Sequence, residues 1–236
     1  MGTGNCYCES DQFIDTLVTV LGLISQFWET PATVMGMVAP PATYPSSNVR
    51  VVDDEMTSGP SRPEDLARLS APLSHELTAE LDGAVQSAGI GVEELLLAAL
   101  ARAIARAVGI GVVTVSGLTT VHPMKLCCAI ESGMDADALL ADVRDAMSPA
   151  GNGAQLPADV VFSFLGLPPE PSFGRQQLAA GPALGVLAYR VDGTLQMDWW
   201  YDLRRLRGCT VEELAAQFRL GLIGLTSEAT PVNLVV

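Results

Sequence analysis

The chain has 236 residues, of which 49% are hydrophobic and 17% are charged. This composition excludes an intrinsically disordered protein and allows one large domain with a sizeable core. The net charge is −14 and Lys125 is the only lysine, so we do not expect nucleic acid, with its phosphate backbone, as a partner.

The first 29 residues combine a polar tail with an amphipathic segment. Residues 1–10 are expected to be disordered, and residues 11–29 to form a helix with a wide apolar face. The uncharged stretch from Thr16 to Trp28 is too short to span a bilayer, so a packed helix is expected. Five cysteines without a secretory leader pattern predict free thiols in the cytoplasm.

Proline and polar residues dominate the next segment. Residues 30–48 read as an irregular crossing segment, residues 48–52 as a possible strand, and residues 53–63 as a loop. A short helix is expected after Pro63, because proline suits a first helical turn.

Two helices are predicted next. Ser74 is a good N-cap for the first, which Gly89 ends. The second runs from about Val92 to Val108 and ends at Gly109. It is apolar nearly all round, so it should be deeply buried.

Strands follow at 110–115 and 119–130, then a helix from about Asp135 to Met147 that begins with acidic residues. Residues 158–166 form a short run of apolar, β-branched and aromatic side chains between Pro157 and Gly166, which predicts a strand covered on both faces. The hydroxyl of Ser163, within this run, is expected to bond to backbone or water.

The C-terminal part begins with a hairpin signal. Strands are predicted at 184–191 and 194–201, joined by Asp192-Gly193, which favours a two-residue turn. A last helix is predicted over 210–225, capped by Thr210 with Glu213 as its capping-box partner. This element order predicts the α+β class, with one mixed sheet and helices packed mainly on one side.

Few residues have the spacing of a catalytic or binding motif. His75 and Asp82 lie about two turns apart on one predicted helix, which is too far for a hydrogen bond and is typical of a solvated face. The basic run 204–207 is more typical of a solvated helix start or turn than of an anion site. No cysteine or histidine group has zinc-ligand spacing, and the sequence has no Gly-rich phosphate loop or acidic metal cluster, so neither a metal nor a bound cofactor is expected.

Several stretches resemble the C-terminal lobe of condensation and epimerization domains of nonribosomal peptide synthetases, in the chloramphenicol-acetyltransferase-like superfamily. They are residues 73–81 and 92–109, which resemble two helices of that lobe, residues 115–126, which resemble a Gly-x-x-Thr strand, and residues 162–166, which are similar to the family's FNYLG motif. Ser163 stands where that motif has asparagine. Phe27-Trp28 is similar to the signature of the segment that links the two lobes.

The resemblance implies one lobe of the chloramphenicol-acetyltransferase-like fold and divides the chain into a tail (1–10), a lobe-linking helix and crossing segment (11–63), the condensation-like lobe (64–226) and a second tail (227–236). The family's catalytic HHxxxDG motif belongs to the N-terminal lobe and is absent from this sequence. No catalytic position can therefore be carried over. Ser116, His122 and Ser163 are the residues expected to line a cleft.

Three functions remain open. The first is a condensation-domain-like half protein that is not catalytic alone and acts as a scaffold or split-domain partner. The second is an acyltransferase or epimerase-type enzyme with a relocated base, for which His122 is the candidate. The third is a degenerate remnant without activity. The expected partners are a complementary lobe, a carrier protein with phosphopantetheine-linked substrates, or a second copy of the chain.

Overall fold

The computed structural model describes residues 47–54, 61–117, 123–148, 157–178 and 181–228. All of them belong to one compact unit, residues 42–236. The predicted helix over 11–29 and the linking segment up to residue 46 lie outside the described residues, so the predicted division of the chain stays a prediction.

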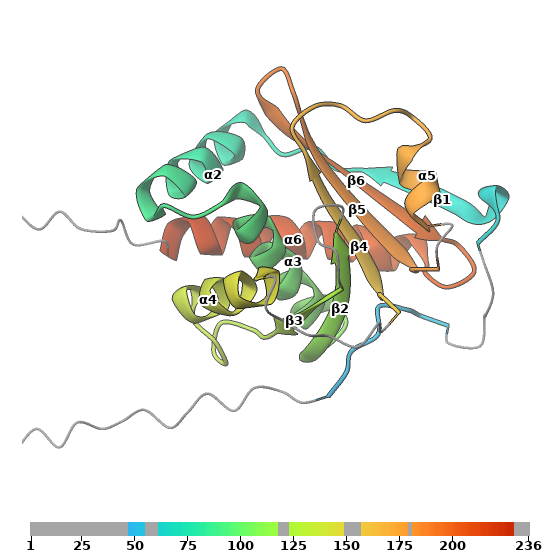
Figure 1. Cartoon of the computed structure of the whole chain (residues 1–236), viewed down its shortest axis with the longest axis horizontal. Coiled ribbons are helices and arrows are strands. Elements are labelled where there is room, and N and C mark those ends of the chain that lie inside the picture. Colours follow the sequence, from blue (N-terminus) through green and yellow to red (C-terminus); the bar gives the residue numbers. More distant parts are fainter. Residues whose placement is uncertain (1–46, 55–60, 118–122, 149–156, 179–180, 229–236) are drawn as a thin grey trace, which may run out of the picture. The chain divides into compact units, whose positions relative to one another are not determined.

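Six strands form one mixed sheet in the order β1-β6-β5-β4-β2-β3 (Figure 1). The strands are β1 (Leu66–Ser70), β2 (Gly111–Gly117), β3 (Met124–Cys128), β4 (Val160–Leu165), β5 (Leu184–Val191) and β6 (Thr194–Asp202). β4 runs parallel to β2 and β5, whereas the three remaining pairs are antiparallel. The strand predicted over 158–166 is therefore internal to the sheet.

Helices cover the two faces of the sheet unequally. They are the single 3-10 turn η1 (Pro63–Asp65) and the α-helices α2 (His75–Ala88), α3 (Val92–Ala107), α4 (Ala136–Met147), α5 (Phe173–Leu178) and α6 (Gly208–Glu228). Trp199 packs edge-on against Phe218 of α6, whereas its neighbour Trp200 contacts Gly174 of α5. Because successive strand residues point to opposite faces, α5 and α6 lie on opposite sides.

The longer helices pack mainly on the face that carries the core, which confirms the predicted α+β arrangement. α3 is buried along most of its length and lies against α6. Gly221 permits a close approach there, since a Cβ on it would lie 3.2 Å from the carbonyl oxygen of Ala99. The alanine-rich sequence of α3 therefore serves helix–helix contact.

Local signals located several element ends correctly. The Ser74 hydroxyl accepts a hydrogen bond from the backbone N–H of Leu77 at 3.2 Å, and Gly89 ends α2 with φ of 63°. Asp192 and Gly193 join β5 to β6, and both have positive φ, 49° and 78°. This is the backbone that a two-residue hairpin turn requires.

Two predictions at element level were wrong, and two elements were not predicted. Residues 48–52 form a single bridge, Asn48 to Val112, instead of a strand. β1 and α5 were not predicted, because each is short. β1 is held by its pairing with β6, and α5 by its packing on the sheet. Thr210 does not cap α6, because the helix begins two residues earlier. The Thr210 hydroxyl donates a hydrogen bond to Asp53.

Candidate functional site

Of the three residues that were predicted to line a cleft, the structure describes Ser116 and Ser163, and it places them in different surroundings. Ser116 lies beside Val161 in the β2–β4 register and lines a pocket. Ser163 is on the same face of β4, because it is two residues further along, but it is buried beneath α5. His122 lies outside the described residues, so its role as a candidate base stays a prediction.

The partner of Ser163 is a side chain, not the backbone or water that we expected. The side-chain amide of Gln177 on α5 donates a hydrogen bond to Oγ of Ser163 at 2.8 Å. The serine is 1% exposed. This bond satisfies a buried hydroxyl and fastens α5 to the sheet, so Ser163 has a structural role here.

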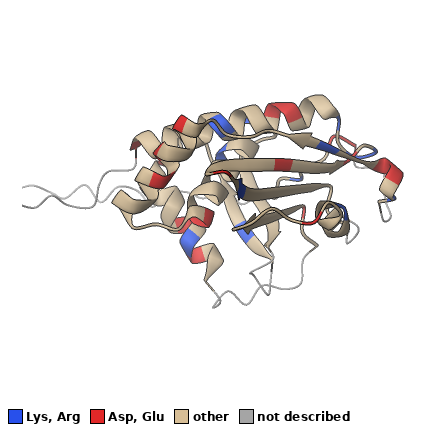
Figure 2. Ribbon diagram, turned by 90° about the horizontal axis from the view of Figure 1, so that it is seen from above, with Lys and Arg blue, Asp and Glu red and all other residues tan. Residues whose placement is uncertain are grey.

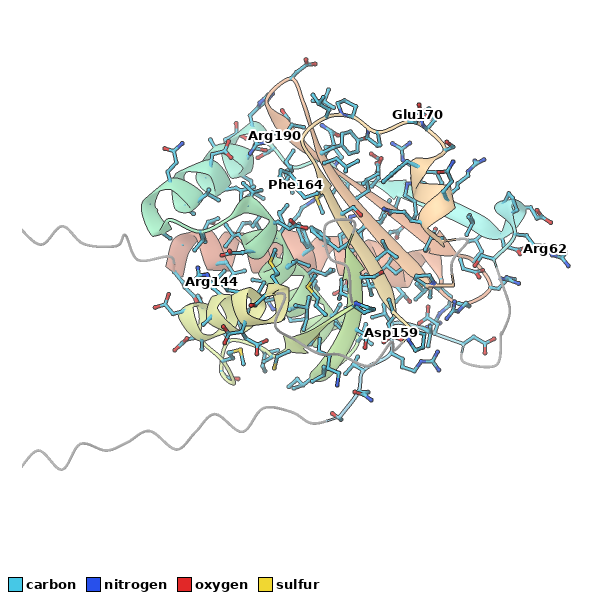
Figure 3. All side chains as sticks on the ribbon, in the orientation of Figure 1. Arg62, Arg144, Asp159, Phe164, Glu170 and Arg190 are labelled. Atoms are coloured by element: carbon cyan, nitrogen blue, oxygen red, sulfur yellow. The ribbon has the colours of Figure 1, made fainter. Side chains whose placement is uncertain are left out.

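The pocket lies where β2 ends beside the start of β4. It has a volume of about 490 Å³ and is lined by Arg50, Ser116, Asp159, Val161, Pro182 and Arg205, among others. These residues come from the segment before β1, from β2, from the start of β4, from the segment before β5 and from the β6–α6 connection. Figure 3 labels Asp159 at this end of the sheet.

Two arginines and one carboxylate give the pocket its charge. Nε of Arg50 lies 3.7 Å from Oδ1 of Asp159, which is longer than a hydrogen bond. The Asp159 backbone N–H donates to the carbonyl of Thr114, which fixes the start of β4 against β2. Burial raises the pKa of the Asp159 carboxyl despite the nearby arginine.

Arg205 reaches the pocket from a connection that is held in place. Its Nη1 donates to the carbonyl oxygen of Gly181 at 2.6 Å. Its own carbonyl accepts backbone hydrogen bonds from Asp53 and Asp54. The charged lining of the pocket therefore consists of the hydrogen-bonded guanidinium of Arg205, the half-exposed guanidinium of Arg50 and the carboxylate of Asp159.

The rest of the basic run 204–207 is paired, not simply solvated. Arg204 donates to both carboxylate oxygens of Asp202, which is fully buried and also accepts from the hydroxyl of Ser61. Burial opposes ionisation of Asp202, but these hydrogen bonds outweigh it and lower the pKa of the carboxyl. Arg207 pairs with Asp53. Arg204 and Arg205 lie in the turn after β6, and each arginine of the run has its own contact.

A second polar cluster lies on the α5 face of the sheet. Trp200 is flanked by the guanidinium groups of Arg68 and Arg175, 5.8 Å and 5.7 Å from the ring centroid. Asp198 is 3% exposed and accepts a hydrogen bond from the Tyr189 hydroxyl at 3.0 Å. Its Oδ1 lies 3.0 Å from Arg68 in an ion pair. These contacts stabilise this face of the sheet.

Histidine and cysteine side chains are dispersed in the described part of the chain. His75 is exposed, with Nδ1 3.1 Å from Oγ1 of Thr194, while Asp82 pairs with Arg190, so His75 and Asp82 do not act together. Cys127 and Cys128 are buried free thiols, and burial raises the pKa of both. Within the described ranges, no three His, Cys, Asp or Glu side chains gather as a metal site.

Sequence reasoning missed Arg50, Asp159 and Arg205 as pocket residues. They are far apart in the sequence, and each alone looks like an ordinary surface charge. The available signal was the position of Asp159, an acid immediately before a buried strand. Only the strand order brings Arg50 and Arg205 to the same place. Figure 2 shows acidic residues on several helices. The charged lining of the pocket, in contrast, consists of two arginines and one aspartate.

Comparison with known proteins identifies the fold. No family model matches the chain. The chain is 32% identical over 227 aligned residues to one of the subunits of the phenolphthiocerol/phthiocerol polyketide synthase of Mycobacterium tuberculosis (strain CDC 1551 / Oshkosh). That match covers 73% of this chain but 15% of the relative, so the chain spans a small part of that protein's length.

Solved structures agree with the resemblance seen in the sequence. The epimerization domain from the third module of tyrocidine synthetase B matches 79% of this chain and 53% of its own chain, at 16% identity and a TM-score of 0.57. The first condensation domain of the CDA synthetase matches 76% of this chain and 49% of its own chain, at 18% identity and a TM-score of 0.54. The described residues thus have the fold of about half of such a domain. None of the described helices has the length and apolar character needed to cross a membrane.

Proposed function

Because the chain shares its fold with one half of condensation and epimerization domains, we propose that it is a condensation-domain-like half protein of nonribosomal peptide or related acyl-transfer assembly. It does not catalyse acyl transfer alone. It acts in the cytoplasm as the structural half of a domain whose complementary lobe carries the HHxxxDG motif. The observation that carries the proposal is the extent of the structural match: about four fifths of this chain aligns with only about half of each solved domain.

Two further observations support this proposal. The curated relative belongs to a polyketide synthase, and the two solved neighbours are named as synthetase domains. Leu220 and Ile223 lie about one turn apart on α6 with 53% and 44% of their surface exposed. A complementary lobe bound at α6 would cover this exposed apolar pair.

The test is reconstitution of the domain from two chains. The purified chain is mixed with an acyl-pantetheine thioester and an amine acceptor, with and without a separately expressed N-terminal lobe that carries HHxxxDG. We expect no condensation product from the chain alone, and product together with a stable complex when the second lobe is added. Light scattering measures the complex independently of activity.

The two histidines provide a matched pair of variants. Product formed by the chain alone, abolished in His122→Ala but retained in His75→Ala, would contradict the proposal and favour an enzyme with a relocated base. If the complementary lobe neither binds nor gives product, the split-domain role is wrong. His75 is a suitable control because it is exposed and contacts Thr194.

A further inference from the structure

The pocket between β2, β4 and the β6–α6 connection contains an excess of positive charge that the proposed structural role does not use. Its charged lining consists of two arginines and one aspartate, in a chain whose net charge is −14. Arg50 and Arg205 come from segments far apart in the sequence, and both reach the same cavity of about 490 Å³. We propose that this pocket binds a small molecule with an anionic oxygen head group, a carboxylate or a phosphate, on a short apolar body.

The head group is inferred from the donors. Guanidinium groups present planar pairs of N–H donors that match carboxylate and phosphate oxygens. Nε of Arg50 lies 3.7 Å from Asp159, and Arg205 uses Nη1 on the Gly181 carbonyl, so each guanidinium retains further N–H groups for a ligand. The hydroxyl-bearing Ser116 on the same lining adds a donor.

The body is inferred from the walls and the size. Apart from the charged and hydroxyl groups, the lining consists of proline, alanine, glycine and valine residues. Cavities of roughly 300–1,000 Å³ with mostly apolar walls and a few polar groups are typical of small-molecule sites. A short acyl or alkyl chain fits such walls, whereas a free inorganic ion would leave most of them uncovered.

Asp159 makes the proposal testable in both directions. Its carboxylate lies close to one of the arginines and repels an incoming anion. Removing the arginine charge should weaken binding, and removing the aspartate charge should strengthen it. Two unit charges about 4 Å apart in water interact by about 1 kcal/mol, a factor of about five in affinity, so we expect changes of about five-fold for Arg50→Gln and for Asp159→Asn.

The experiment titrates the full chain with three probes at constant ionic strength: inorganic phosphate, butyl phosphate and hexanoate. Calorimetry measures affinity, and the Nε–Hε resonances of the arginines show which side chains respond. We expect saturable binding of butyl phosphate or hexanoate that shifts the resonances of Arg50 and Arg205. The tighter of these two probes identifies the source of the head group as a phosphate ester or a carboxylic acid.

Matched variants separate the pocket from general surface charge. Arg219→Gln removes an arginine on the exposed face of α6, and Asp145→Asn removes an exposed aspartate on α4, so neither should change the affinity. Arg50 has 51% of its side chain exposed, so Arg50→Gln should fold normally. The proposal is overturned if no probe saturates, if Arg219→Gln weakens binding as much as Arg50→Gln, or if Asp159→Asn fails to strengthen it.

Discussion

Arg102 on α3 should be among the most sensitive single positions of this fold. Its side chain is 1% exposed. Nη1 donates to the carbonyl oxygen of Ala129 at 3.0 Å, and Nη2 donates to that of Met134 at 2.5 Å. These carbonyls lie at the two ends of the connection between β3 and α4, so one side chain holds that connection against α3. Burial lowers the pKa of its guanidinium, while Glu131 at 3.8 Å from Nε opposes that shift.

The change Arg102→Met keeps an unbranched apolar stem but removes both donors. Ala129 and Met134 are each 5% exposed, so their carbonyl groups would lose their partner with little access to water. Each unsatisfied buried acceptor costs about 1–3 kcal/mol. Relief of the buried charge offsets part of this loss, so we expect the free energy of unfolding to fall by about 3 kcal/mol.

Urea unfolding followed by tryptophan fluorescence measures this loss. Arg106→Met is the matched control on the same helix, because Arg106 is 23% exposed and pairs with Glu131 at the surface. It should cost less than about 1 kcal/mol. Equal unfolding free energies for Arg102→Met and wild type, or equal losses in the two variants, would refute the reasoning.

Three further predictions concern other contacts. The Asp53 carboxylate accepts hydrogen bonds from the backbone N–H of Arg207 at 2.7 Å and from the hydroxyl of Thr210 at 2.8 Å, at the start of α6. Asp53→Ala removes this acceptor and should lower the free energy of unfolding, measured in urea, by about 1–2 kcal/mol. Asp53→Asn should lower it by less. In Gly174→Ala the new Cβ would overlap the Trp200 indole ring, which should cost about 1–3 kcal/mol and alter near-UV circular dichroism, whereas Gly224→Ala, with open space around it, should not destabilise. The pKa of Asp202 is lowered in the folded state, so the unfolded chain takes up a proton more readily. Asp202 therefore contributes to the free energy of unfolding above about pH 4, and this contribution is lost as the pH falls through the lowered pKa. Asp202→Asn should therefore flatten the fall of stability measured between about pH 5 and pH 2, and an unchanged slope would contradict that assignment.

The sequence alone determined the elements whose signals are local. Ser74, Gly89 and Asp192-Gly193 impose backbone conformations through their own side chains or φ preferences, and the structure has the element ends and the turn where they predict them. The apolar run around Phe162 similarly predicted a buried strand, because a stretch without charged side chains must be covered on both faces. The resemblance to one lobe of a condensation domain agrees with the fold of the described residues.

Tertiary structure alone decided how distant residues meet. The sheet order places β4 between β2 and β5, and that order brings Arg50, Asp159 and Arg205 to one pocket although no local pattern connects them. The same holds for Ser163, whose partner Gln177 lies on a helix too short to predict. Local conformational preferences act over a few residues. The set of charged side chains in a pocket depends instead on which strands pair across the chain, and the pattern of residues along the sequence does not predict that pairing.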